Sequence, residues 1–169
     1  MGCEMREQLV PHSIQADCAN LSVRLVKPVL VVLHHTGAPG PGSLEWLRTS
    51  RSNVSADFLI MGSGQVYKLN PQLSRFYTWH AGVSRYGKFV EVNPVSFGIE
   101  LEHVPGEVWR ADQLASCVAV VAFLVWKFGI PLRNVVGHKN VAWPRGRKTD
   151  PEGFPWREFR AALKAKVGV

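Results

Sequence analysis

The stretch VLVVLHHTG, residues 29–37, decides the fold of this chain. Its first five residues are valine and leucine, a composition typical of a strand buried in the middle of a sheet. We predict this strand from Val29 to His34. The paired histidines lead into a loop of glycine and proline, and the end of a strand next to such a loop is a common place for a functional site in α/β proteins.

A second segment, GHKNVAWPRGRKTDPEGFPW at residues 137–156, carries a further set of reactive side chains. Its many glycines and prolines predict an irregular backbone. Lys148 and Asp150 are two residues apart, so in an extended segment both side chains can face one pocket. Together, His138 and Asp150 offer an imidazole and a carboxylate, which are two of the three protein ligands of a typical catalytic zinc site.

The histidine pair at the end of the first strand is the strongest candidate for the third ligand. Adjacent residues of a strand point to opposite faces, so only one of His34 and His35 can face the metal, and we take His34. Two neutral imidazoles and one carboxylate suit a single Zn²⁺ ion with one position open to water. His12 and His103 are interpreted as structural.

Short hydrophobic runs predict further elements around these two segments. Two strands, Phe58 to Met61 and Gln65 to Leu69, read as a hairpin, and a third strand is expected from Ser96 to Leu101 with Glu100 on its polar face. The segment FYTWHAGVSRYGK, residues 76–88, fits neither period and is expected to be a loop. Residues 1–24 are polar and aperiodic, and we interpret them as a lead-in to a domain spanning residues 25–169.

Three helices are expected. Ser43 is a candidate N-cap for a helix to Arg51, and Asp112 for an apolar helix to about Phe128 in which Cys117 is a core residue. A last helix has Pro155 in its first turn. Together with the strands, these helices predict one α/β domain with a mixed central sheet flanked by helices, and a metal groove at one edge of the sheet.

Composition and charge restrict the class of protein. The chain has 169 residues, 46% of them hydrophobic and 20% charged, as in an ordinary globular domain. Its net charge of +7 favours a polyanionic partner, which could be nucleic acid, a membrane surface or a cell-wall polymer. The basic residues are scattered, so we expect no nucleic-acid partner. We also expect a monomer.

Other features bear on the compartment. The three cysteines form no CxxC pair, which predicts no disulfide framework. No signal peptide is visible at the N-terminus. The longest apolar run, Leu114 to Trp126, is too short to span a bilayer. We therefore expect synthesis in the cytoplasm without a signal peptide.

Five motifs together resemble one family. In order along the chain these are VLHHTG, SADFLI with GQVYKL, TWHAGVSRYGK, NPVSFGIELE and GHKNVAWPRGRKTDPEGFPW. Their order and spacing resemble the zinc-dependent N-acetylmuramoyl-L-alanine amidases of the type-2 amidase and peptidoglycan-recognition superfamily, from about Val29 to Phe159. The resemblance implies a type-2 amidase fold, and an enzyme that hydrolyses the amide between the lactyl group of N-acetylmuramic acid and L-alanine in peptidoglycan.

The resemblance also implies roles for individual residues. The zinc ligands it implies are His34, His138 and Asp150, the same three chosen above. It implies catalytic roles for Glu100, as the general base, and for Lys148, as a cation beside the developing oxyanion. The alternatives are a structural ion pair for Glu100 and a solvated surface position for Lys148.

Five further residues are candidates for substrate binding. They are His35, Trp79, His80, Lys88 and Asn93. For His80 the alternative is a residue that only braces its loop, and for Trp79 it is packing within the loop. The chain departs from the family pattern at Asp57, where many members carry a histidine; Asp57 could fix the tautomer of a ligand histidine or be an ordinary strand residue.

The biological setting has three possible forms. A compact basic amidase resembles a bacteriophage endolysin, which would act on the wall or in the periplasm after release, and this is the interpretation we place first. The alternative is a cytosolic amidase that recycles anhydro-muropeptides. A third hypothesis is a peptidoglycan-binding module without catalytic activity.

Overall fold

The structure is a computed structural model, and it describes residues 12–169. Its main sheet has six strands in the order β1, β5, β4, β9, β3, β10. These strands are β1 Ser13–Gln15, β5 Val66–Lys68, β4 Phe58–Ile60, β9 Ser96–Leu101, β3 Leu30–His35 and β10 Val135–Gly137. All neighbours pair in parallel except β4 and β5, which form an antiparallel hairpin. The predicted mixed sheet is confirmed.

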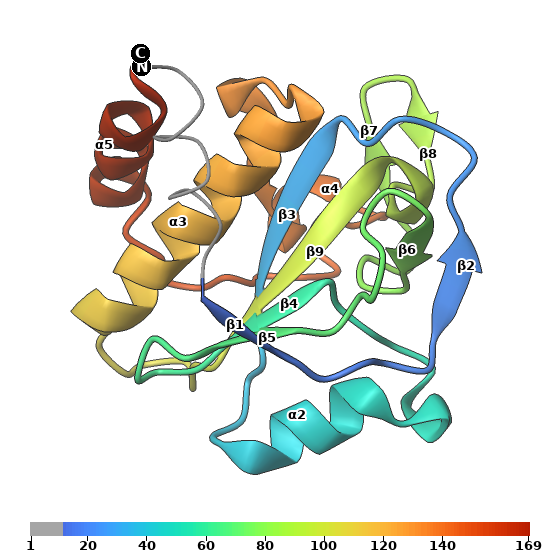
Figure 1. Cartoon of the computed structure of the whole chain (residues 1–169), viewed down its shortest axis with the longest axis horizontal. Helices are drawn as coiled ribbons and strands as arrows, with labels where there is room; N and C mark the ends of the chain where they lie inside the picture. Colours follow the sequence, from blue (N-terminus) through green and yellow to red (C-terminus); the bar gives the residue numbers. More distant parts are fainter. Residues whose placement is uncertain (1–11) are drawn as a thin grey trace.

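Two long helices cover one face of this sheet (Figure 1). They are α3, Ala111–Phe128, and α5, Trp156–Val167. Alternation along the strands explains the contact, because Val31 and Leu33 of β3 and Phe97 and Ile99 of β9 all point into the cluster that α3 and α5 complete. Cys117 lies in this cluster, fully buried, as expected.

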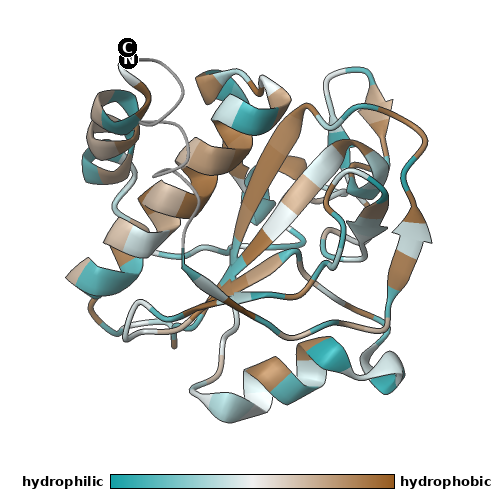
Figure 2. Cartoon of the chain, viewed as in Figure 1, coloured by the Kyte–Doolittle hydropathy of each residue, from teal (hydrophilic) through white to brown (hydrophobic). Residues whose placement is uncertain are grey.

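Shorter elements lie on the opposite side. They are α2 Pro41–Arg48, α4 His138–Val141, the pair β2 Leu21–Val23 with β6 Phe76–Thr78, the hairpin of β7 Arg85–Tyr86 and β8 Phe89–Val90, and 3₁₀ turns at Ser50–Ser52 and Asn93–Val95. A third 3₁₀ turn, Leu132–Asn134, connects α3 to β10. Leu30 and Val32 of β3 point toward this side and pack with Val136. The strands are therefore apolar on both faces, which Figure 2 shows as continuous brown along β3.

Helix α3 is strongly apolar between Asp112 in its first turn and Lys127 in its last. Its 18 residues have a mean hydropathy of 1.5, which satisfies the length and composition of a membrane span. Eight of these residues are buried, mostly against the sheet, and core helices pass the same criterion. It packs against both the sheet and α5, as a core helix does.

Several predicted boundaries were wrong. Helix α2 begins at Pro41 after Gly40, not after a Ser43 cap, and it ends at Arg48. Helix α3 begins at Ala111, so Asp112 lies in its first turn, where a carboxylate favours the helix dipole, and is not its N-cap.

Six short strands were not expected: β1, β2, β6, β7, β8 and β10. Residues 13–23, interpreted as a lead-in, contain β1 at the edge of the main sheet and β2; residues 1–11 lie outside the described residues. The segment expected to be a loop contributes β6 and β7, and β10 precedes His138. Each has only two or three residues, too few to show a period. The predicted strand Ser96–Leu101 and the hairpin of β4 and β5 are confirmed.

Candidate metal centre and active site

Three neighbouring parallel strands, β9, β3 and β10, place candidate residues at one edge of the sheet. In the register of β3 with β9, His34 lies directly beside Glu100. Val136 of β10 lies beside Val32, so His138, two residues later, continues the same row next to His34. Parallel strands end at the same edge, and side chains two residues apart share a face. The topology thus places these three side chains together on the face opposite α3.

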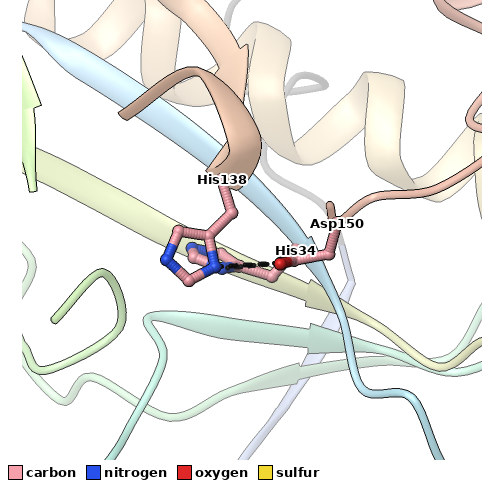
Figure 3. A group of neighbouring side chains, drawn as sticks. All are labelled: His34, His138 and Asp150. Carbon is pink, nitrogen blue, oxygen red and sulfur yellow. Dashed lines mark hydrogen bonds and ion pairs between the residues drawn. The ribbon is translucent and has the colours of Figure 1, made fainter. Parts of the chain in front are cut away.

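Asp150 completes a compact cluster with the two histidines (Figure 3). Its Oδ2 atom lies 3.0 Å from Nδ1 of His138 and 3.3 Å from Nδ1 of His34. One potential ligand atom from each of the three residues lies within 4.8 Å of the others. The segment before Asp150 is irregular, but its end is fixed, because the backbone N–H of Lys139 in α4 donates to the Asp150 carbonyl at 2.9 Å.

The glycine that precedes His138 is required by close packing. A Cβ atom at Gly137 would lie 2.8 Å from Cδ of Pro151 and 3.2 Å from Cζ2 of Trp156. Real Cβ atoms do not approach other atoms so closely. The bare backbone at Gly137 lets the segment of Asp150 and Pro151 lie against β10, which brings Asp150 next to His138.

The outer nitrogens of both histidines also have partners. Nε2 of His138 lies 3.0 Å from the carbonyl oxygen of Ala81, and because a carbonyl can only accept, Nε2 carries the proton. The same carbonyl accepts from Nη2 of Arg147 at 3.1 Å. Nε2 of His34 lies 2.9 Å from Nδ1 of His80. Both histidines therefore direct Nδ1 toward Asp150.

Charges in this cluster are arranged for a cation. Burial lowers the pKa of His34 to about 4, so its imidazole is neutral at pH 7. Burial acts to raise the pKa of Asp150, but the imidazoles of His138 and His34 beside it outweigh this and hold the pKa well below its usual range. A neutral imidazole and an ionised carboxylate are the forms that bind metal ions.

The donor set fits zinc. Two imidazole nitrogens and one carboxylate oxygen converge, each outer imidazole nitrogen has its own hydrogen-bond partner, and three protein ligands leave one position open. The three residues are buried at the bottom of a pocket of about 670 Å³. This pocket gives a substrate access to the open side of the cluster.

Glu100 and Lys148 line the same pocket. Oε2 of Glu100 is buried and has no hydrogen-bond partner among the described residues. Burial, reinforced by the charge of Asp150, raises the pKa of Glu100 to about 8, while Lys148 acts in the opposite direction. Lys148 itself is exposed. The pocket thus holds a carboxyl group with a raised pKa and a cation near the cluster of His34, His138 and Asp150.

The structure brings together only some of the residues assigned to substrate binding. His35 and His80 line the pocket, and both ring nitrogens of His35 are without hydrogen-bond partners among residues 12–169. Trp79, Lys88 and Asn93 are not among the lining residues. Trp79 donates to Ser22, and Asn93 accepts from the backbone N–H of Ala81.

Asp57 has a different role from the two that we considered. It contacts neither ligand histidine; its carboxylate accepts hydrogen bonds from Asn70, Thr78 and the backbone N–H of Gly98, at 2.6, 2.8 and 2.8 Å. Burial raises its pKa, and these three hydrogen bonds act to lower it. Asp57 therefore joins β4, β6 and β9 under the site.

Other lining residues were not predicted. Arg147 lies next to Lys148, and Trp46, on α2, forms part of the far wall with a half-exposed ring. No local pattern in the sequence shows that α2 faces the cluster of His34, His138 and Asp150.

Comparison with known proteins agrees with this geometry. Residues 25–153 match the family model described as N-acetylmuramoyl-L-alanine amidase (Amidase_2). Because the match spans well over half of the chain, the protein belongs to this family.

The chain is also similar to individual proteins. The chain is 33% identical over 156 residues to the 1,6-anhydro-N-acetylmuramyl-L-alanine amidase AmpD of Enterobacter cloacae, covering 81% of each chain. It is 27% identical over 150 residues to the N-acetylmuramoyl-L-alanine amidase AmiD of Escherichia coli, covering 77% of this chain and 51% of that protein.

Solved structures share the fold. A selenomethionine derivative of AmpD superimposes with a TM-score of 0.80 at 27% identity, covering 91% of this chain and 96% of that one. A mutant endolysin from Bacillus subtilis has a TM-score of 0.70 at 24% identity, covering 91% and 99%. The type-2 amidase fold is therefore confirmed.

Proposed function

We propose that the domain at residues 25–169 is a zinc-dependent amidase that hydrolyses the bond between the lactyl group of 1,6-anhydro-N-acetylmuramic acid and L-alanine in soluble muropeptides. The observation that carries this proposal is the convergence of His34, His138 and Asp150 at the bottom of a pocket that also contains Glu100 and Lys148. The similarity to AmpD over 81% of both chains supports the substrate.

The chemistry follows from the groups in the pocket. Zinc held by His34, His138 and Asp150 would supply a Lewis acid and a nucleophile available at neutral pH. Glu100, whose Oε2 atom is buried without a partner among the described residues, would in its ionised form take a proton from the attacking water and return it to the leaving amine, and the burial that raises its pKa makes this carboxylate a stronger base. Lys148 places a positive charge where the carbonyl oxygen becomes negative.

The two biological settings differ in substrate. The names of the curated relatives favour the recycling of anhydro-muropeptides over the endolysin interpretation that the sequence suggested first. The likeness to an endolysin, at 24% identity, concerns the fold, and the net charge of +7 is the feature that favours action on an anionic wall.

The test compares soluble and polymeric substrate. The zinc-loaded chain is incubated with 1,6-anhydro-N-acetylmuramyl tripeptide and, separately, with purified sacculi, and the new amino groups of L-alanine are measured. We expect rapid release from the soluble muropeptide and at least tenfold slower release from sacculi, with neither in Asp150→Ala. Faster release from sacculi would support the endolysin setting, and no release from either substrate by the wild type would overturn the amidase proposal.

A further inference from the structure

A hydrogen-bonded chain of three residues lies behind His34, on the side away from Asp150. Nε2 of His34 lies 2.9 Å from Nδ1 of His80, and Nε2 of His80 lies 2.9 Å from Oγ of Ser96. Oγ of Ser96 lies 2.6 Å from the carbonyl oxygen of Val92. The three side chains are buried, and these contacts are the hydrogen bonds that their ring nitrogens and hydroxyl make on this side.

The position of the proton in each of these three hydrogen bonds follows from the last one, between Ser96 and Val92. The carbonyl of Val92 can only accept, and two oxygens 2.6 Å apart need a proton between them, so the Ser96 hydroxyl donates to Val92. That hydroxyl has no second proton, so it must accept from His80. Nε2 of His80 therefore carries a proton.

The proton of His34 lies on Nε2 for a related reason. The two ring nitrogens of His80 contact Ser96 and His34, so neither meets a carboxylate that would stabilise a buried imidazolium. In the neutral ring with its proton on Nε2, Nδ1 is an acceptor. Nε2 of His34 must then be the donor, which leaves Nδ1 of His34 without a proton and facing Asp150.

The backbone holds His80 in this position. A Cβ atom at Gly98 would lie 2.3 Å from Cγ of His80, so the imidazole rests directly on the backbone of β9. The backbone N–H of Gly98 donates to Asp57, which fixes this part of the strand. The ring of His80 has no room to turn away from His34 on that side.

We propose that His80 and Ser96 are positioning residues that lock His34 in the tautomer that presents Nδ1 to the metal ion. The inference rests on the proposed function, because it takes His34 as a ligand. The inference gives His80 a role other than contact with substrate. Without these hydrogen bonds, His34 could carry its proton on Nδ1, where the proton would compete with the metal ion. Outer partners of ligand histidines typically change metal affinity by about 10–100-fold.

Zinc affinity, measured by competition with a chromogenic chelator, tests this role without an activity assay. Ser96→Ala and His80→Leu are each expected to weaken zinc binding by about 10–100-fold. His80→Asn keeps an acceptor near the position of Nδ1 and is expected to restore most of the affinity. Ser116→Ala is the matched control, because it also removes a serine hydroxyl that donates to a backbone carbonyl, that of Gly64, but outside the site.

The tautomers themselves can be observed by ¹⁵N NMR of the metal-free chain labelled at histidine, where no metal ion fixes the proton of His34. We expect protonated Nε2 atoms on His34 and His80, and scalar coupling between Nε2 of His34 and Nδ1 of His80 across their hydrogen bond. In His80→Leu we expect His34 to populate the tautomer with its proton on Nδ1. If His80 only packs against the strand, the tautomer of His34 should not change in this variant.

The outcomes separate this inference from the proposed function. A proton on Nδ1 of His80, or zinc affinities of Ser96→Ala and His80→Leu equal to that of Ser116→Ala, would overturn the positioning role even if the wild type is an active zinc amidase. A wild type that binds no zinc would refute the proposed function as well. Wild-type binding, weak binding in the two variants and recovery in His80→Asn would establish the inference.

Discussion

At the scale of single residues, the ionisation of Glu100 in its buried position lowers the free energy of unfolding of the metal-free chain. Its folded-state pKa of about 8 lies above the ordinary value of 4.5, so the metal-free folded chain binds this proton more tightly than the unfolded chain does. The free energy of unfolding therefore falls as the pH rises from about 4.5 to 8. Without metal, Glu100→Gln should be more stable than the wild type by roughly 2–4 kcal/mol at pH 8.5 and equally stable below pH 4.

Chemical denaturation of both chains at the two pH values, in the presence of chelator, measures this difference. An equal gap at both pH values would show that the ionisation of Glu100 is not its source. The same variant, loaded with zinc, should lose about 10²–10⁴-fold in kcat. Full activity in Glu100→Gln would exclude it as the general base.

Lys148 gives a second prediction at this scale. Lys148→Ala should lower kcat by about 10²–10³-fold with little change in zinc affinity, because the cation acts on charge that develops during the reaction. The matched control is Lys139→Ala: this lysine is also exposed, lies one residue after His138 and does not line the pocket. Equal losses in the two variants would indicate a general electrostatic effect and remove the specific role of Lys148.

At the scale of elements, the packing of β10 against the segment after Asp150 is the most demanding contact. Gly137→Ala would place a Cβ atom 2.8 Å from Pro151, so we expect a loss of about 1–3 kcal/mol in stability and weaker zinc binding as Asp150 is displaced. Gly42→Ala, on α2 with no atom within 4 Å of the added Cβ, should leave stability unchanged or slightly higher. Thermal unfolding compares the two, and equal stability would contradict the packing argument.

The elements also show how far the sequence can predict the fold. Strand β9 was predicted with its observed bounds, because six residues with alternating character and flanking polar groups define a period. Strands β1 and β10 were missed, since three residues define no period and each is stabilised by a partner far along the chain. The predicted Ser43 cap was wrong because Pro41, which is well tolerated in the first turn, starts α2 earlier.

The candidate site was predictable to a similar extent. His34, His138 and Asp150 stand in motifs whose residue types indicate metal binding, and the structure brings them together. His34 and His80 are 46 positions apart in the sequence, and no local pattern predicts the contact between them. Trp79 is the chain neighbour of His80, but its indole N–H donates to Ser22, and Asn93 accepts from the backbone N–H of Ala81, so both side chains are engaged in holding the loop.

At the scale of the whole molecule, the site couples metal binding to folding. The ligands come from β3, from α4 directly after β10 and from the segment before α5, so only the folded chain brings them together. Zinc should therefore raise the free energy of unfolding by about 4 kcal/mol at a concentration one thousand times its Kd. Thermal unfolding across a zinc titration measures this, and His138→Ala should show little of the increase; a comparable increase in that variant would place the bound zinc elsewhere.

The most direct test of the account is the zinc content of the chain. After equilibration with zinc and removal of the excess, elemental analysis of the wild type should give one zinc ion per chain, and Asp150→Ala and His138→Ala should each retain much less. A wild type without zinc, or variants that retain as much zinc as the wild type, would contradict the assignment of the metal to His34, His138 and Asp150.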